Sequence, residues 1–386
     1  MKSIKKLFVT ALAAVSLLAP IGKYEVKRAN AETLAECKAA YLCDYESGTV
    51  AYSHNETERL PIASMCKIMT LLLSFEAVDS GNLAYDELVP VSENASGMGG
   101  SQVYLGSNLS YPAEQLMKSI TVCSANDSCV ALAERIAGSE GAFIEKMNER
   151  ARELGAENTL FANCTGLPKE PQYSCAKDVA LMLRELLKHQ KYFEFSKVWL
   201  EDFVHPDGRT TSMTNTNKLI RFYDGCDGGK TGFTNQAGFC LAATAKRGDM
   251  RLISVVIGAE SSDKRFEGIK SMLNYAFANY ESRKIVTTDV PIKQKLPVRG
   301  CKQKEISVCA ERPLTVFVKK GEEVETSTEV LLNKDVKAPF GAGREVGEVI
   351  LYCAGVETDR CKLLAAEPAE KFSYGEAFRE ISRNWN

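Results

Sequence analysis

The stretch at residues 60–81 constrains the fold of this chain more than any other feature of its sequence. Residues 68–75 read Ile-Met-Thr-Leu-Leu-Leu-Ser-Phe and are apolar on nearly every side. Such a run predicts a buried helix rather than an amphipathic surface helix. Ser64 precedes the run, where serine favours the start of a helix, and Gly81 follows it. We therefore expect a buried helix that begins at Ser64 and ends near Gly81.

Ser64 and Lys67 form an S-x-x-K pair at the beginning of this predicted helix. Residues three apart lie on one face of a helix, one turn apart. A serine hydroxyl becomes a nucleophile when a neighbouring base takes its proton, and burial can lower the pKa of a lysine enough for it to be that base. A lone S-x-x-K is common by chance, however, and then consists of a capping serine and a lysine that reaches solvent. Other motifs must decide between these interpretations.

The length and charge of the chain limit its function. With 386 residues it is long enough for two domains. Its net charge is −2, but residues 1–31 carry six basic residues against one acidic residue, so the remainder has a net charge of −7. A chain that acidic is not a nucleic-acid binder by bulk charge.

The N-terminus has the pattern of a secretory signal peptide. Three lysines within the first six residues precede an apolar stretch at 7–19, which is too short to span a bilayer stably. The tripeptide Ala-Asn-Ala at 29–31 fits a cleavage site. We therefore expect an extracytoplasmic protein whose mature chain begins at Glu32.

All 13 cysteines lie in the predicted mature chain. Their odd number leaves at least one thiol unpaired within the chain, and export would permit disulfides among the others. Buried free thiols fit the sequence equally well. No C-x-x-C occurs and there are only three histidines, so we expect no metal site and no cofactor. Six spaced couples can be written: 37/43, 123/129, 164/175, 226/240, 301/309 and 353/361.

The predicted elements describe an α+β catalytic part followed by a small all-β part. Before residue 190 we expect a hairpin at 39–43 and 49–52, a loop at 91–110, and helices at 113–120, 128–138, 139–154 and 178–187. Strands at 224–233, 239–245 and 252–257 then precede a helix at 262–280. This order suggests an antiparallel sheet packed on the N-terminal hairpin, with helices on its faces. Beyond residue 283, short alternating runs between Gly-rich and charged turns predict strands alone.

Two further motifs follow the S-x-x-K pair along the chain. Ser124-x-Asn126 lies between two predicted helices, and Lys230-Thr231-Gly232 lies on a predicted strand. Each motif is weak alone, because S-x-N before a helix is usually a cap and K-T-G is usually a lysine beside a turn. Together, in this order and these contexts, the three motifs closely match the signature of penicillin-recognising serine enzymes.

The sequence around the motifs resembles the low-molecular-mass, type-5-like penicillin-binding proteins that are D-alanyl-D-alanine carboxypeptidases. The stretches that carry the resemblance are Pro-Ile-Ala-Ser-Met-Cys-Lys at 61–67, Ser-Ala-Asn-Asp at 124–127, Asn-Cys-Thr-Gly-Leu at 163–167 and Gly-Lys-Thr-Gly-Phe-Thr at 229–234. The resemblance implies a catalytic domain like those of β-lactamases and transpeptidases. Class A β-lactamases have S-D-N as the middle motif and a deacylating glutamate in an E-x-x-L-N pattern between that motif and K-T-G, whereas this chain has S-A-N and no E-x-x-L-N in that interval.

The resemblance also implies a role for each residue of the first two motifs. Ser64 would attack the carbonyl of the penultimate D-Ala and form an acyl-enzyme. Lys67, uncharged when it acts, would take the serine proton. Ser124 would relay that proton to the leaving amine, and Asn126 would hold Lys67 and the substrate amide. Cys66 faces away from Ser64 at i+2 and is expected to be a core residue.

The K-T-G stretch is expected to bind the substrate. The resemblance implies that Lys230 supplies positive charge for the terminal carboxylate, and that Thr231 and Thr234 add hydroxyl hydrogen bonds to it. Gly232 would let the substrate lie against the strand edge, where a side chain would collide. The oxyanion hole would consist of the backbone N–H groups of the nucleophile and of Phe233.

The leading hypothesis is an exported serine carboxypeptidase that trims D-Ala from peptidoglycan stem peptides and is acylated by β-lactam antibiotics. The alternatives are a β-lactamase, a cell-wall endopeptidase with the same site, and an inactive peptidoglycan-binding protein. Domain boundaries are expected as follows: signal peptide 1–31, serine peptidase domain 32–283, all-β domain 284–370 and amphipathic C-terminal helix 371–386.

The C-terminal segment, residues 371–386, has the pattern of a membrane-surface helix. At 100° per residue four of its aromatic and aliphatic side chains fall within an arc of ~60°, whereas four charges and Phe372 lie on the opposite side. The members of the stripe are Tyr374, Phe378, Ile381 and Trp385. Such a helix could lie in the interface of a bilayer with its stripe down. The alternative is a helix that packs the same stripe on the all-β domain.

Overall fold

The computed structural model describes residues 34–371 and Gly375 of the chain. The predicted signal peptide and nearly all of the predicted C-terminal helix therefore lie outside the described residues. Within the described part of the chain, no helix combines the length and the apolar composition that a bilayer crossing requires.

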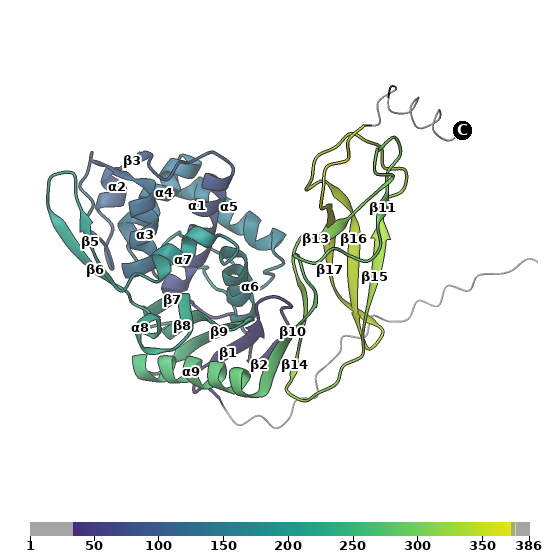
Figure 1. Cartoon of the computed structure of the whole chain (residues 1–386). Coiled ribbons are helices and arrows are strands. Elements are labelled where there is room, and N and C mark those ends of the chain that lie inside the picture. Colours follow the sequence, from purple (N-terminus) through teal and green to yellow (C-terminus); the bar gives the residue numbers. More distant parts are fainter. Residues whose placement is uncertain (1–33, 372–374, 376–386) are drawn as a thin grey trace, which may run out of the picture. The chain divides into compact units, whose positions relative to one another are not determined.

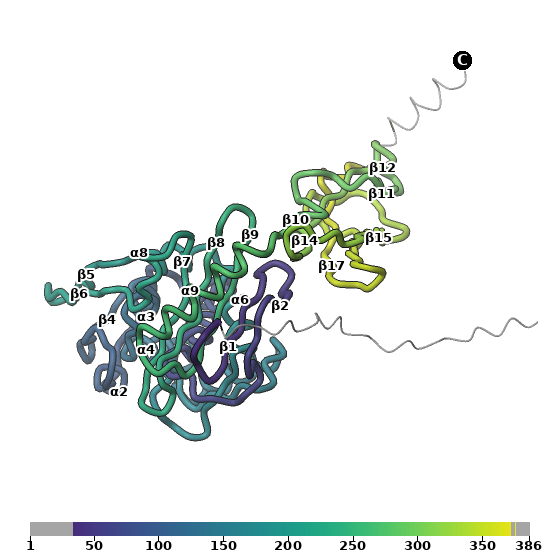
Figure 2. The backbone as a smooth tube through the Cα atoms, turned by 90° about the horizontal axis from the view of Figure 1, so that it is seen from below, coloured from purple at the N-terminus to yellow at the C-terminus, as the bar shows by residue number. Residues whose placement is uncertain are grey.

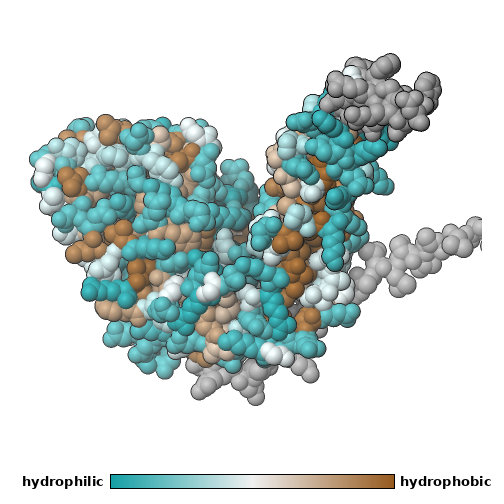
Figure 3. Space-filling model, viewed as in Figure 1, coloured by the Kyte–Doolittle hydropathy of each residue, from teal (hydrophilic) through white to brown (hydrophobic). Residues whose placement is uncertain are grey.

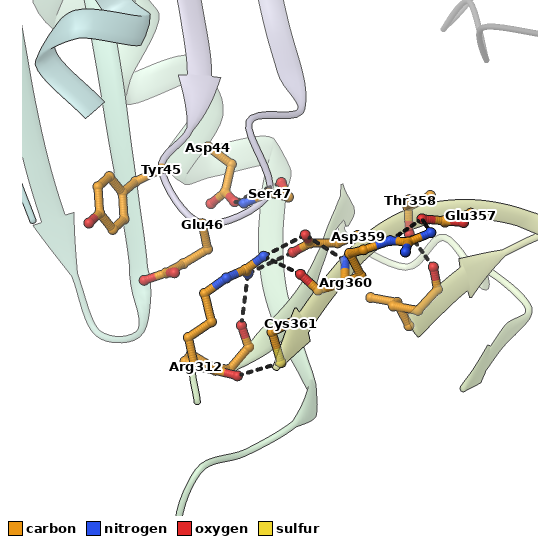
Figure 4. Close-up of polar contacts among 12 residues, drawn as sticks. Asp44, Tyr45, Glu46, Ser47, Arg312, Glu357, Thr358, Asp359, Arg360 and Cys361 are labelled. Atoms are coloured by element: carbon orange, nitrogen blue, oxygen red, sulfur yellow. Dashed lines mark hydrogen bonds and ion pairs between the residues drawn. The ribbon is translucent and has the colours of Figure 1, made fainter. Parts of the chain in front are cut away.

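A five-stranded antiparallel sheet with the order β2-β1-β9-β8-β7 organises the part of the chain that contains the motifs (Figure 1). Its strands are β1 (Ala39–Asp44), β2 (Val50–His54), β7 (Cys226–Thr234), β8 (Gly238–Arg247) and β9 (Met250–Ala259). In the β1–β2 turn, the Asp44 carboxylate accepts hydrogen bonds of 2.8 Å from the N–H and the hydroxyl of Ser47 (Figure 4). The predicted hairpin, the three later strands and the antiparallel sheet that joins them are confirmed.

Helices cover both faces of this sheet, as predicted (Figure 1). On one face α9 (Ser262–Asn279) packs against β8 and β9, and on the other α6 (Ala176–Leu186) packs against β1 and β9. The other helices of this part are η1 (Ala63–Cys66, a 3₁₀ turn), α1 (Lys67–Asp79), α2 (Glu93–Ser96), α3 (Ala113–Cys123), α4 (Asn126–Ala137), α5 (Glu140–Glu153), α7 (Gln190–Ser196) and α8 (Leu219–Phe222).

Helix α1 is the buried helix that the sequence predicts. Most of its residues are buried, including Lys67, and it packs against α3, α4, α5 and α6. The prediction that the helix begins at Ser64 is wrong in detail, because the 3₁₀ turn η1 precedes α1 and the Ser64 side chain makes no capping hydrogen bond. The Ser64 hydroxyl therefore does not cap a helix and remains available for another interaction.

Several helix ends confirm the predicted start and stop signals. The Ser139 hydroxyl accepts a hydrogen bond of 3.2 Å from the N–H of Ala142 at the start of α5. Gly138 ends α4 in the left-handed conformation, with φ +81°. Helix α9 begins at Ser262, as predicted, and the Ser261 side chain caps it.

Short elements between α6 and β7 are absent from the sequence-based prediction. Strands β5 (Leu200–Val204) and β6 (Thr210–Thr214) form a hairpin that buries one residue of each strand, Phe203 and Met213. With so few apolar positions, the hairpin has no alternating pattern to detect. A second pair of short strands, β3 (Leu88–Pro90) and β4 (Ser110–Pro112), is also absent from the prediction. These two strands pair with each other at the two ends of the loop predicted at 91–110.

Beyond α9 the described residues form strands, as predicted (Figure 2). They make a four-stranded antiparallel sheet, β13-β17-β16-β15, and two pairs, β10–β14 and β11–β12. Their bounds are β10 (Tyr280–Val286), β11 (Leu296–Pro297), β12 (Glu305–Ile306), β13 (Val308–Ala310), β14 (Leu314–Lys319), β15 (Thr326–Leu332), β16 (Glu345–Cys353) and β17 (Val356–Ala365). Arg312 ties the loop before β14 to β17 through two hydrogen bonds to the Asp359 carboxylate, of 2.6 and 2.8 Å (Figure 4).

All 13 cysteines lie within the described residues, and all are free thiols. Nine are buried and four are partly exposed. The sequence leaves open disulfides or free thiols, and the structure agrees with the free thiols. Buried thiols of this kind act as small apolar residues in helices and strands.

Polar residues cover much of the face drawn in Figure 3, and apolar residues gather in a band along the all-β part. Large apolar side chains that are more than half exposed include Leu88, Leu200 and Phe222. Single exposed apolar residues are ordinary on a soluble surface. The features that distinguish this molecule are instead its buried polar groups.

Candidate active site

Ser64 and Lys67 lie where the 3₁₀ turn η1 passes into α1. The Lys67 Nζ atom lies 2.9 Å from the Ser64 Oγ atom, so the i, i+3 spacing brings the two groups into contact as predicted. Ala63, directly before the serine, has φ +48°, a left-handed conformation that is uncommon for a residue with a side chain. Such strain is typical of functional turns.

The amine of Lys67 is fully buried and is held by acceptors alone. Its Nζ atom donates a hydrogen bond to the carbonyl of Thr165, in the loop after α5. Burial lowers the pKa of Lys67 below its ordinary value. A neutral amine can donate to the Thr165 carbonyl and still present its lone pair to the Ser64 hydroxyl. The geometry therefore suits a base that receives the serine proton.

Ser124 and Asn126 occupy the junction of α3 and α4. Ser124 ends α3 in the left-handed conformation, with φ +68°, and its buried Oγ atom has no hydrogen-bond partner. Asn126 donates from Nδ2 to the carbonyl of Gly99 at 2.7 Å, whereas its buried Oδ1 atom also has no partner. Buried polar atoms without partners are rare and call for an explanation. A bound substrate would satisfy both.

Lys230 and Thr231 lie on β7, the terminal strand of the sheet. Lys230 is almost fully buried, and its Nζ atom donates to the carbonyl of Thr231 at 3.1 Å. Burial is the main cause that lowers the pKa of Lys230, to about 7. The Thr231 hydroxyl donates to the hydroxyl of Thr216 at 2.8 Å, so the two hydroxyls form one polar pair.

No carboxylate pairs with Lys67 or Lys230 among the residues that the structure describes. A buried ammonium without a counter-charge is costly, because it has lost its water and gained no partner. The site therefore lacks one negative charge, which an anionic ligand would supply.

Gly232 holds β7 against the turn that carries the nucleophile. A Cβ atom placed there would lie 2.7 Å from the Ile62 carbonyl oxygen and 3.1 Å from the Ser64 nitrogen. The prediction explained this glycine by the approach of the substrate, but the contact that excludes a side chain is with the chain's own backbone. Gly232 thereby brings β7 next to Ser64.

Phe233 and Thr234 continue β7 beyond this contact. Phe233 is half exposed, and its ring lies 4.3 Å from that of Phe239, centroid to centroid. The Thr234 hydroxyl accepts a hydrogen bond of 3.0 Å from the N–H of Ala237, within the turn after β7. Thr234 also lines a pocket together with the loop 166–173 and residues 61–63. Its surroundings thus differ from those of Thr231.

Three groups near the site carry no role in the sequence analysis. The Thr165 carbonyl and the Thr216 hydroxyl come from loops that the motif spacing does not reveal. Arg265, buried on α9, donates to the carbonyls of Gly232 and Cys240 at 3.3 Å each. Of the three, only Thr165 lies in a stretch that carries the family resemblance, residues 163–167. The resemblance assigned no role to that stretch.

Cys66 and Asp227 lie next to the motifs but outside the reacting groups. Cys66 is buried, and its thiol donates to the carbonyl of Asn163 at 3.2 Å, which confirms a core position. Asp227 forms a two-pronged ion pair with Arg251 at the start of β7. The described residues contain no group of three or more His, Cys, Asp or Glu side chains that could hold a metal ion.

Comparisons with known proteins cover both parts of the chain. Residues 25–261 match the family Peptidase_S11, described as D-alanyl-D-alanine carboxypeptidase, and residues 280–371 match the C-terminal domain family of penicillin-binding protein 5. The chain is 38% identical over 387 residues to the D-alanyl-D-alanine carboxypeptidase DacF of Bacillus subtilis, an alignment that spans 99% of each protein.

Two solved structures have the same architecture. A peptidoglycan synthesis regulatory factor (PBP3) from Streptococcus pneumoniae is 27% identical with a TM-score of 0.71, over 87% of this chain and 100% of that one. Penicillin-binding protein 5 from Haemophilus influenzae is 28% identical with a TM-score of 0.68, over 87% of this chain and 98% of that one.

Proposed function

This chain belongs to the D-alanyl-D-alanine carboxypeptidase family of serine peptidases, and we propose that Ser64 is the residue through which it removes the terminal D-Ala from peptidoglycan stem peptides. The protein is a low-molecular-mass penicillin-binding protein and a serine carboxypeptidase. These relationships favour the leading hypothesis over a β-lactamase or an inactive binding protein. The observation that carries the assignment of Ser64 is the 2.9 Å contact of its hydroxyl with a buried lysine amine.

The reaction proceeds in two steps at Ser64. The Ser64 hydroxyl attacks the carbonyl of the penultimate D-Ala as its proton passes to the neutral amine of Lys67. The bond to the terminal D-Ala breaks when the leaving nitrogen receives a proton through the Ser124 hydroxyl, which leaves an ester on Ser64. Water then adds to the ester, the bond to the Ser64 oxygen breaks as that oxygen regains a proton from the water, and the shortened peptide departs with its new carboxylate. The free Oγ atom of Ser124 leaves that hydroxyl available for the relay.

The N–H groups of Ser64 and Phe233 form the oxyanion hole in this proposal. Strand β7 ends the sheet, so alternate N–H groups on its outer edge have no strand partner. The close approach of Gly232 to the Ser64 nitrogen brings the two donors to one place. Donors fixed in this way stabilise a developing negative oxygen without reorganisation.

Lys230, Thr231 and Thr216 bind the terminal carboxylate of the substrate. The carboxylate supplies the counter-charge that the buried Lys230 ammonium lacks, and the paired hydroxyls add hydrogen bonds to it. Asn126 binds the substrate amide through its unpaired Oδ1 atom. The Thr234 hydroxyl accepts from the N–H of Ala237 and keeps its own proton free to donate to the same carboxylate.

The direct test of this function uses purified mature protein and a synthetic pentapeptide that ends in D-Ala-D-Ala. We expect release of one D-Ala per peptide and stable labelling by a fluorescent penicillin. A cross-linked dimer of stem peptides, offered in the same assay, should remain uncut if the carboxypeptidase assignment is correct. Rapid turnover of the penicillin would instead indicate a β-lactamase, and cleavage of the dimer alone would indicate an endopeptidase.

The pH dependence of kcat/KM should show the loss of the positive charge of Lys230. Its pKa is about 7 in the free enzyme, and carboxylate binding needs its charged form. Lysine loses its charge as pH rises, so kcat/KM for a peptide with a free C-terminal carboxylate should fall about tenfold per pH unit above pH 7. The profile is measured between pH 5 and 9 by D-Ala release.

A matched pair of acylating agents separates this effect from general pH sensitivity. Acylation by a penicillin should fall above pH 7, whereas acylation by its methyl ester, which lacks the carboxylate, should not. Both compounds should acylate the Lys230→Ala variant at the slow rate of the ester. An equal loss on the penicillin and the ester would contradict the carboxylate-binding role.

The chain is proposed to act outside the cytoplasm, tethered to the outer face of the cytoplasmic membrane by residues 371–386. The basic and apolar pattern of residues 1–31 supports export, and the aromatic stripe of the last sixteen residues supports an interfacial helix. Tyrosine and tryptophan favour the depth at which such a helix lies.

Deletion of residues 371–386 should move the mature protein from vesicles to the soluble fraction in a flotation experiment. Replacing Phe378 and Trp385 together by Ser should have the same effect, because it removes the stripe and keeps the charges. Penicillin labelling should be unchanged in both variants. If the complete mature protein fails to float with the vesicles, the tether is wrong.

A further inference from the structure

Side chains from outside the sheet hold the beginning of β7, directly before Lys230. Strand β7 is the last strand of its sheet, and its pairing with β8 is irregular at this beginning. The Gly228 carbonyl accepts a hydrogen bond of 3.3 Å from the Asn217 Nδ2 atom. The Gly229 N–H donates to the Tyr192 hydroxyl at 2.9 Å. Buried backbone groups need such partners, because an unpaired group costs free energy. The position of Lys230 therefore depends on these side chains.

The segment 215–217, Asn-Thr-Asn, supplies one of these side chains and is itself firmly anchored. Both of its asparagines are almost fully buried. The Asn215 Nδ2 atom donates to the carbonyls of Ser196 and Val198, at 3.0 and 2.8 Å. The Asn215 Oδ1 atom accepts from the N–H of Asn217 at 2.9 Å, and the Asn217 Oδ1 atom accepts from the first N–H group of α8 at 3.1 Å. The two side-chain amides thus bind backbone groups and hold the segment on either side of its threonine.

Thr216 lies between the two asparagines and joins the end of α3 to β7. Its N–H donates to the carbonyl of Val122 at 3.0 Å, two residues before Ser124. Its hydroxyl accepts from the hydroxyl of Thr231 at 2.8 Å. Because the Thr216 oxygen accepts that hydrogen bond, its own proton remains available to donate to a carboxylate. Thr216 is partly exposed, so a substrate can reach this hydroxyl.

We infer that Asn215 and Asn217 are positioning residues for carboxylate recognition, and that they act by fixing the hydroxyl of the threonine between them. The inference rests on the proposed function, because it takes Lys230 and the paired threonine hydroxyls as the groups that bind the terminal carboxylate. Neither asparagine binds the substrate, since both side-chain amides are bound to backbone groups. On a loosened segment the Thr216 hydroxyl would occupy several positions, and a misplacement of about 1 Å is enough to slow an enzyme strongly.

The test compares acylation by a penicillin with acylation by its methyl ester, as the ratio of the two second-order rate constants. A loss that is common to both compounds cancels in this ratio, so the ratio reports carboxylate recognition and not general damage to the fold. Thr216→Val should lower the ratio about 10- to 100-fold, the usual effect of losing a hydrogen bond to a charged group. Asn215→Ala and Asn217→Ala should each lower it about fivefold or more, because the hydroxyl is then held less firmly.

A double variant shows whether the asparagine acts through the threonine. When Thr216→Val and Asn217→Ala are combined, the ratio should equal that of Thr216→Val alone, because a hydroxyl that is absent cannot be misplaced. A further decrease in the double variant would show that the asparagine acts by another route, and would overturn the inference. A wild-type ratio in both single asparagine variants would overturn it as well.

The matched control is Asn148→Ala on α5. The Asn148 amide likewise binds the backbone of a distant loop, because it donates to the carbonyl of Phe161 at 2.9 Å and accepts from the N–H of Phe161 at 2.8 Å. This control should keep the wild-type ratio. Asn215→Ser and Asn217→Ser replace any alanine variant that circular dichroism shows to be unfolded, and unfolding of all four asparagine variants would overturn the inference in favour of a purely structural role. A wild-type enzyme that reacts equally fast with penicillin and ester would instead overturn the proposed carboxylate site, and the inference with it.

Discussion

Replacing Ser64 with Ala should abolish penicillin labelling and D-Ala release together, while the protein remains folded. Removal of a nucleophile of this kind costs about six orders of magnitude in rate, because the covalent route is lost. The side chain of Ser64 caps no helix, and its hydrogen-bond contact is with the Lys67 amine. The melting temperature should therefore change by no more than a few degrees. Labelling with fluorescent penicillin and D-Ala release measure the two activities.

The control for this variant is Ser80→Ala at the other end of the same buried helix. Ser80 is exposed, and its hydroxyl donates to the Ala77 carbonyl at the end of α1. It should retain wild-type labelling and peptide release. Residual covalent label in Ser64→Ala would show that another residue is the nucleophile.

Replacing Lys67 with Met should slow acylation by penicillin about 10²- to 10⁴-fold, the usual contribution of a general base. Methionine has a similar length and no charge, so the fully buried position should tolerate it. Because the buried amine lacks a carboxylate partner, the variant should be at least as stable as the wild type. The acylation rate and the melting temperature are measured on the same preparation.

The control for the lysine is Lys188→Met, an exposed residue beyond α6 that pairs with Glu185. Its acylation rate should equal that of the wild type. A decrease of less than tenfold in Lys67→Met would show that the serine proton goes elsewhere. In that case the 2.9 Å contact would be structural rather than catalytic.

The sequence predicts well those features that depend on neighbours in the chain. The buried helix α1, the hairpin β1–β2 and the strands β7 to β9 each follow from a local apolar pattern. The i, i+3 spacing of Ser64 and Lys67 likewise fixes their contact within one turn. The spacing alone could not show that η1 is a 3₁₀ turn.

Features that depend on distant segments required the structure. The left-handed conformation of Ser124 and the unpaired atoms of Ser124 and Asn126 arise where α3, α4 and the loop at 99–101 meet. Thr216 reaches Thr231 from a loop fifteen residues earlier. Local propensities carry no information on such tertiary contacts, because the segments that meet have no sequence pattern in common.

Gly232 illustrates the same limit within a motif that the sequence does reveal. The sequence shows that K-T-G ends in this glycine, but it does not show why. A Cβ atom at this position would collide with backbone atoms of Ile62 and Ser64, some 170 residues earlier in the chain. The physical reason for the glycine is thus a tertiary contact. That contact joins the strand that binds substrate to the turn that carries the nucleophile.

The most direct test of the central claim is to locate the penicilloyl group by tryptic digestion and fragment-ion mass spectrometry. Trypsin cuts after Arg59 and Lys67 and releases Leu-Pro-Ile-Ala-Ser-Met-Cys-Lys, in which Ser64 is the one serine. We predict that the added mass of the penicillin lies on this peptide, at Ser64. Label on Cys66 within the same peptide, or on any other peptide, would contradict the assignment of Ser64 as the nucleophile.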